Sequence, residues 1–188
     1  MVSLRLASVG RMAKTGDHAM TAAEAAALDA ATEDAVAAAG AAGGAIGGAI
    51  GGGIGSGGAG AAGGALGGRK GGALGGRFGA RFLKPMTVEV TVEVPCAADT
   101  VRERARALIA GSGRLIEDPN ESDDGSVWGI VASGAMNLTP ALVRVQAEAA
   151  GSGKSRVHIR ATGKEGLIKQ RIGAKAADRI AKAISQTP

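Results

Sequence analysis

The chain has 188 residues, enough for one ordinary domain, but 33 of them are glycine and only 2% are aromatic. The single Cys96 excludes an internal disulfide framework, and the net charge of +5 favours anionic partners such as lipid headgroups or nucleic acid. Large side chains are scarce in residues 1–84, so an independent hydrophobic core is expected only in residues 85–188.

Residues 1–20 are expected to form a flexible basic N-terminus, and an Ala-rich helix is expected over 21–39. Thr21 and Glu24 have the spacing of a capping box, in which each side chain bonds to the backbone N–H of the other residue. Alanine, which dominates the following residues, is the best helix former. Because the apolar face of this helix is almost entirely alanine, it must pack closely against a partner to be stable.

Residues 40–84 form a repeat of four, with two small residues followed by Ile, Leu or Phe at many of the steps. A period of four lies close to the helical turn of about 3.6 residues, so the large side chains form one stripe and the glycines a groove beside it. Small residues four apart let helix backbones approach closely. The glycines predicted to pack against another helix are Gly43, Gly47, Gly51, Gly55, Gly63, Gly67, Gly71 and Gly75.

Three membrane structures are consistent with the uncharged run from Ala35 to Gly68: one tilted span, a span followed by an interfacial helix, or a two-span hairpin that turns near Gly55–Gly58. A flexible glycine-rich linker is a fourth. An isolated helix in water is excluded because each glycine costs about 1 kcal/mol relative to alanine.

A basic collar follows the uncharged run, and no acidic residue lies within it. For a protein that resides in the membrane, the positive-inside rule places this collar, and with it residues 85–188, on the cytoplasmic side. The last helix adds further cations off its apolar stripe. The residues predicted to contact an anionic surface are Arg69, Lys70, Arg77, Arg81, Lys84, Lys169, Lys175 and Arg179.

The stretch GGAIGGAIGGGIGS resembles the glycine-zipper membrane segments of bacterial envelope proteins, including the two-span type of the 17 kDa surface antigen group. The likeness covers about 40 residues. It implies membrane residence and oligomerisation rather than a reaction.

Residues 85–188 read as an antiparallel sheet covered by two helices, an α+β fold in the order β-α-β-β-β-β-α. Val88, Val90, Val92 and Val94 alternate with Thr and Glu, as in a strand with one buried face. The expected strands are 88–94, 114–117, 127–133, 142–149 and 156–162, and the expected helices are 97–110 and 166–185.

The first strand, the Pro-Cys-Ala-Ala-Asp-Thr-Val turn and the amphipathic last helix resemble the helix-grip superfamily, which is START-like or polyketide-cyclase-like. A smaller sheet with two helices, similar to half of a TATA-binding-protein saddle, fits the same pattern.

Four motifs that suggest chemistry are better explained without it. Gly151–Ser155 lacks the first glycine of a phosphate loop and reads as a hairpin turn. Gly55–Gly60 matches a dinucleotide pattern only because glycine is so frequent there, and residues 120–125 start a calcium loop whose closing glutamate is absent. Nothing in the sequence brings Cys96 near His158. We therefore expect no enzyme activity, no catalytic residue, no cofactor and no metal.

Two hypotheses follow. The first is a non-enzymatic membrane protein that self-associates through its glycine-zipper helix and displays a small cytoplasmic α+β domain, for scaffolding, envelope maintenance or membrane permeabilisation. The second is a soluble α+β binding module for an apolar ligand or an anionic polymer, lipid or nucleic acid, with the glycine tract as a flexible tether. Lipid is the expected partner, a homo-oligomer the expected assembly, and nucleic acid the less favoured ligand.

Overall fold

The computed structural model describes residues 20–80, 82–116, 125–133, 139–166 and 170–186, and within 47–63 it describes the backbone alone. The elements in chain order are helix α1 (Ala22–Ala80), strand β1 (Lys84–Val94), helix α2 (Ala98–Ser112), strands β2 (Gly113–Leu115), β3 (Val127–Ser133), β4 (Thr139–Ala149) and β5 (Ser155–Glu165), and helix α3 (Ile172–Gln186).

The five strands form one antiparallel sheet in the order β1-β5-β4-β3-β2. Strand β1 pairs with β5 in an unbroken register from Lys84↔Glu165 to Val94↔Ser155. Alternate residues along a strand point to opposite faces, so the valines of β1 lie on one face and its threonines and glutamates on the other. The predicted order β-α-β-β-β-β-α is confirmed for residues 84–186.

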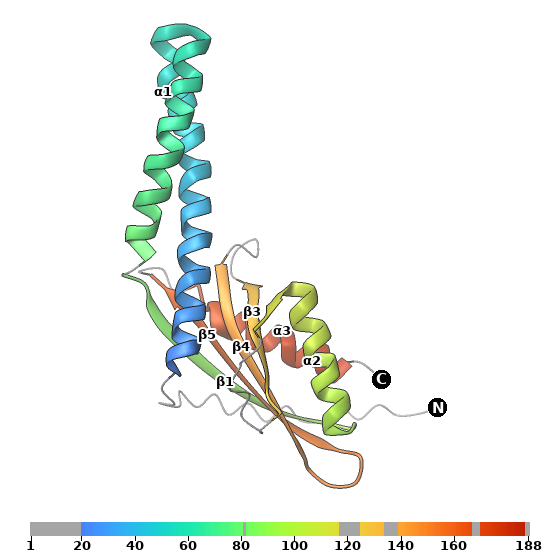
Figure 1. Cartoon of the computed structure of the whole chain (residues 1–188). Coiled ribbons are helices and arrows are strands. Elements are labelled where there is room, and N and C mark those ends of the chain that lie inside the picture. Colours follow the sequence, from blue (N-terminus) through green and yellow to red (C-terminus); the bar gives the residue numbers. More distant parts are fainter. Residues whose placement is uncertain (1–19, 81, 117–124, 134–138, 167–169, 187–188) are drawn as a thin grey trace.

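Helices α2 and α3 cover one face of the sheet, which we call the inner face (Figure 1). The main core lies between these two helices and the sheet, and it includes buried Val, Ile and Ala residues from β1, β3, β4 and β5. Helix α3 lies very close to the sheet because the contact residues are small. A Cβ atom on Gly173 would lie 2.8 Å from the carbonyl oxygen of Ala161, and one on Gly163 would lie 2.6 Å from Cγ2 of Ile172.

The opposite, outer face of the sheet is covered in part by the first turns of α1. Leu28 is fully buried there in a second apolar cluster with Trp128, Ile130 and Leu142. This cluster gives the Ala-rich helix the partner that its sequence requires. The helix predicted over 21–39 is confirmed, and so is its capping box.

Helix α1 continues past Ala39 and folds back on itself as a hairpin of two antiparallel legs that stand away from the sheet (Figure 1). A Cβ atom added to Gly72 would lie 2.1 Å from the oxygen of Gly40, and one added to Gly44 would lie 2.0 Å from the oxygen of Gly68. Gly40 thus lies against Gly72, and Gly44, one helical turn later, lies against Gly68. Both pairs are centred on Ser56, so the hairpin turns there. The chain therefore turns where the two-span hairpin is predicted to turn, whereas placement of the two legs in a membrane stays a prediction.

The glycine tract is helical in the structure and does not form the flexible tether of the second hypothesis. The physical reason is that the two legs pack against each other, so the backbone entropy lost at each glycine is offset by close backbone contact. In the part of the chain that the structure describes, no helix has both the length and the mean hydropathy needed to cross a membrane.

The last helix begins at Ile172, later than the predicted residue 166, while β5 runs on to Glu165. The Glu165 carboxylate accepts a hydrogen bond of 2.8 Å from the backbone N–H of Ile172 and so occupies one free donor of the first helical turn. Arg171 has a φ of 55°, a left-handed conformation that reverses the chain direction immediately before the helix. Ile168, the first residue of the predicted stripe, lies outside the described residues.

Candidate functional site

The side of the second hairpin leg that faces away from the first leg carries large exposed apolar residues. Both phenylalanines of the chain lie there, with Phe78 63% and Phe82 70% exposed. Their rings contact each other edge to face, with centroids 5.4 Å apart. Burial of one such side chain contributes about 1.5–3 kcal/mol. An exposed pair is therefore typical of a surface that binds a membrane or another molecule.

The exposed apolar residues form a continuous edge along the hairpin because the glycines occupy the other side of the helix. Gly68, Gly72 and Gly76 face the first leg, and residues two positions away along a helix point to the opposite side. Residues spaced by four from Leu66 therefore all face outward. The exposed large apolar residues of this edge, which continues past the end of α1 onto β1, are Leu66, Leu74, Phe78, Phe82 and Met86. Ile46 is also exposed, but it lies two residues after Gly44 and so faces away from the second leg.

Basic side chains are interleaved with this apolar edge. Lys70 lies four residues from both Leu66 and Leu74, and Arg77 lies three residues after Leu74, so they share its face. No Asp or Glu occurs between Asp34 and Glu89. We use the name outward face for the exposed residues Leu66, Arg69, Lys70, Leu74, Arg77 and Phe78.

A buried carboxylate fixes the base of the hairpin on the sheet. Glu24 is 3% exposed, and its carboxylate accepts a hydrogen bond of 2.9 Å from the backbone N–H of Thr21. The same carboxylate lies 3.6 Å from a guanidinium nitrogen of Arg144 and 3.7 Å from one of Arg160. These arginines lie directly opposite each other on β4 and β5, where two like charges would repel without the carboxylate between them.

A second ion pair ties the hairpin to the sheet farther along the first leg. The ammonium nitrogen of Lys164 lies 2.9 Å from the carboxylate of Asp29. Together with the apolar cluster around Leu28, these charged contacts orient the whole hairpin relative to the α+β domain.

A polar hollow of about 280 Å³ lies beside the two arginines on the outer face of the sheet. Thr91 and His158, on adjacent strands, are joined in it by a contact of 3.1 Å between Oγ1 and Nδ1. Its charges balance, since Glu89 and the nearby Glu24 accompany the two arginines. Its lining residues are Glu89, Val90, Thr91, Arg144, Gln146, His158, Ile159 and Arg160.

The glycines predicted to pack against another helix lie in a different register from those that join the two legs. A Cβ atom added to Gly43, Gly67, Gly71 or Gly75 would meet nothing within 4 Å. Gly47, Gly51, Gly55 and Gly63 lie in the stretch where the backbone alone is described. Packing of these glycines against another chain stays a prediction.

The residues predicted to contact an anionic surface differ in their exposure. Arg69, Lys70, Arg77, Lys84 and Lys175 are exposed, whereas Arg81 and Lys169 lie outside the described residues. Arg179 is half-buried and donates to the backbone oxygen of Ala132, so it connects α3 to β3.

The structure shows no contact between Cys96 and His158, the two residues considered as a nucleophile and its base. The sulfur of Cys96 lies 3.8 Å from a guanidinium nitrogen of Arg104, whereas His158 contacts Thr91. Gly151–Ser155 is the turn that joins β4 to β5, with Gly151 and Gly153 at positive φ, as expected for a hairpin. Within the described residues no group of three His, Cys, Asp or Glu side chains is placed to hold a metal ion, and most of 120–125 is not described.

Sequence reasoning missed the role of Glu24 beyond its helix cap, and it missed Arg144 and Arg160 altogether. The alternation of Val with polar residues marks strands β4 and β5 but does not say which residues of two strands lie opposite each other. The sequence predicts a stripe of Ile, Leu and Phe along the helix. It does not predict that this stripe faces away from the glycines at which the two legs touch.

The likenesses of this chain to known proteins are confined to solved structures. No family model and no curated protein matches the chain. Among solved structures, a START superfamily protein from Mycobacterium smegmatis aligns with 53% of this chain and 94% of its own, at 10% identity and a TM-score of 0.38. At that TM-score the likeness carries no argument, so the helix-grip resemblance of residues 85–188 and the glycine-zipper resemblance both stay predictions.

Proposed function

We propose that this protein is a non-catalytic α+β module that attaches to an anionic lipid surface through the outward face of its hairpin. The observation that carries the proposal is exposed Phe78 in line with exposed leucines and cations on one helix face, with exposed Phe82 against it just past the end of the helix. The apolar residues favour the acyl boundary and the cations favour the headgroups. This combination is typical of helices that lie in the membrane interface.

The energetics support reversible attachment. Each cation near an anionic surface contributes about 1 kcal/mol, and each apolar side chain that becomes fully buried contributes about 1.5–3 kcal/mol. Arg69, Lys70 and Arg77 therefore add a component that depends on lipid charge and salt. Leu74 and Phe78 add one that does not.

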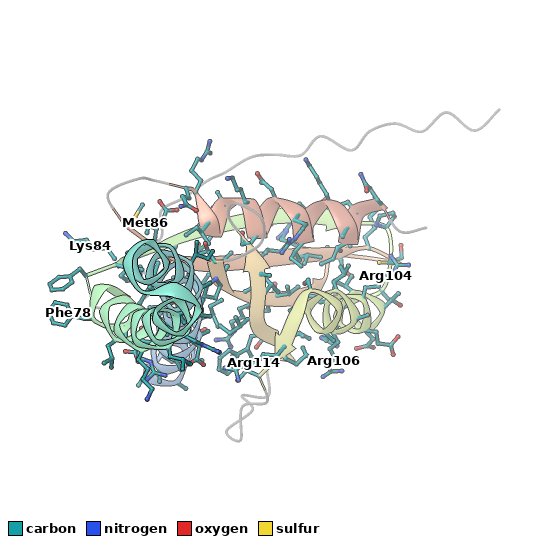
Figure 2. All side chains as sticks on the ribbon, turned by 90° about the horizontal axis from the view of Figure 1, so that it is seen from above. Phe78, Lys84, Met86, Arg104, Arg106 and Arg114 are labelled. Carbon is teal, nitrogen blue, oxygen red and sulfur yellow. The ribbon has the colours of Figure 1, made fainter. Side chains whose placement is uncertain are left out.

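The hairpin is suited to this task because its shape is held from within. The legs approach each other backbone to backbone at Gly40 and Gly72, so neither leg needs lipid to satisfy its packing. The ion pairs of Glu24 hold the hairpin against the sheet, which presents the outward face in one orientation. In Figure 2 Phe78 lies at the edge of the molecule, away from α2 and α3.

Flotation of the full chain with vesicles tests the proposal. We expect binding to vesicles of phosphatidylcholine mixed with phosphatidylglycerol, weaker binding to phosphatidylcholine alone, and a decrease as salt rises. The variant Phe78→Ser with Phe82→Ser should lower partitioning at least tenfold on both vesicle types. Lys70→Glu with Arg77→Glu should lower it mainly on the anionic vesicles.

Arg106→Glu is the matched control, since Arg106 is an exposed cation on α2, on the other side of the molecule from Phe78 (Figure 2). It should bind nearly as the unchanged chain does. Equal binding by the double-serine variant and the unchanged chain would refute the proposal.

A further inference from the structure

Strand β1 is an edge strand, and within the described residues no strand pairs with its second side. It pairs with β5 on one side and stands at the end of the sheet order. Its eleven residues run in one register with β5, without a bulge. Natural edge strands are usually short, bulged or interrupted by proline, because their free backbone groups otherwise pair with another chain. Pro85 lies near one end of β1 and leaves the rest open.

The side chains at this edge are partly uncovered. Helix α3 and the core bury Val92 and Val94, whereas Met86 is 42% exposed and Val88 is half-buried. The outer face of the strand carries Thr and Glu in alternation. An occupant of this edge would therefore supply a strand with apolar residues on one face and uncharged or basic residues opposite the glutamates.

A second copy of β1 meets these requirements when the two strands run antiparallel and Val90 faces itself. On the inner face, Val88 then lies opposite Val92 of the second copy. On the outer face, Glu89 lies opposite Thr91 of the second copy. By the same symmetry Thr87 lies opposite Glu93 and Met86 opposite Val94, so no pair of like charges arises.

Neighbouring registers are less favourable. Centring on Glu89 places the two Glu89 carboxylates against each other, and centring on Thr91 places Glu89 against Glu93 twice. Centring on Val88 brings Pro85, which has no N–H to donate, into the paired segment. The charge pattern and Pro85 together thus favour the register centred on Val90 among these four.

We infer that two copies of this chain associate through β1, in an antiparallel pairing centred on Val90, to form one continuous ten-stranded sheet across a two-fold axis. Such an interface uses the same residues on both copies, as closed dimers commonly do. It is independent of the lipid contact, because the outward face of the hairpin supplies none of the paired residues.

Light scattering coupled to size-exclusion chromatography of the full chain tests the association. We expect a concentration-dependent species of twice the 18.3 kDa chain mass. Thr91→Glu should raise the dimer dissociation constant about two- to thirtyfold, because by symmetry it creates two repulsive pairs with Glu89. Thr91→Lys should lower the constant, since the same two positions then attract. Ser152→Glu, in the exposed turn after β4, is the control for added charge.

Cysteine cross-linking tests the register. On a Cys96→Ser background, Val90→Cys should form a disulfide-linked dimer under mild oxidation, because directly opposite residues of antiparallel strands lie about 4.5–5.5 Å apart between Cα atoms. Val88→Cys and Val92→Cys should each fail to cross-link alone and should cross-link when mixed. A monomeric mass at every concentration, or equal cross-linking of the three single variants, would overturn the inference.

Discussion

Glu24 illustrates how one side chain serves both local and tertiary structure. Within the first helical turn it closes a capping box with Thr21, a role that depends on residues three apart and is visible in the sequence. In the folded chain the same carboxylate separates two arginines from different strands. The second role depends on the register of β4 and β5, which local sequence does not specify.

Glu24→Gln separates these two roles. Glutamine retains the cap but removes the charge that balances Arg144 and Arg160, so we expect the free energy of unfolding to fall by about 1–3 kcal/mol. Urea denaturation of the full chain measures this change.

Asp34→Asn removes an exposed charge from the same leg and should change stability by less than about 0.5 kcal/mol. If the two variants were equally stable, the contacts of Glu24 with Arg144 and Arg160 would not contribute to the free energy of unfolding.

At the scale of elements, the hairpin shows that glycine register decides helix packing. The repeat contains two glycines in nearly every four residues, and either series could face the other leg. The structure places Gly40, Gly44, Gly68, Gly72 and Gly76 at the contact and leaves the series that includes Gly71 open. Sequence periodicity predicts that a groove exists but does not say which of two adjacent glycines lines it.

Adjacent alanine substitutions should therefore have opposite effects. Gly71→Ala adds a methyl group in open space and should stabilise the helix by about 0.5–1 kcal/mol. Gly72→Ala should destabilise the hairpin, because its Cβ atom would lie 2.1 Å from the oxygen of Gly40. Thermal unfolding followed by the helical circular-dichroism signal distinguishes the two. Stabilisation by both would show that the legs do not approach at Gly72.

At the scale of the whole molecule, helices from different parts of the chain cover both faces of the sheet. Helices α2 and α3 bury the inner face, and the first leg of α1 buries Leu28 against Trp128 on the outer face. The hairpin and the α+β domain are thereby one folded unit. Apolar contacts therefore cross the boundary between the N-terminal tract and the C-terminal domain that composition suggests.

Leu28→Ala tests this dependence. We expect a loss of about 2–5 kcal/mol, because a fully buried leucine leaves a cavity beneath the first leg. Trp128 is the only tryptophan, and the chain has no tyrosine, so its fluorescence reports on this contact alone. Its emission should shift to longer wavelength at lower urea concentration than in the unchanged chain.

Leu66→Ala removes the same number of atoms from a side chain that is 66% exposed and should leave the unfolding midpoint nearly unchanged. Coincident fluorescence transitions in the two leucine variants would mean that the first leg does not protect Trp128.

The sequence by itself determined the elements and their order. The alternation of valines predicted β1, the capping box predicted the start of α1, and the isoleucine spacing predicted α3, because each pattern is set by the local periodicity of strands and helices. Tertiary structure decided which glycines touch, where Glu24 finds its arginines and which way Phe78 points. Each depends on two segments distant in sequence meeting in one register, and neither segment encodes that register alone.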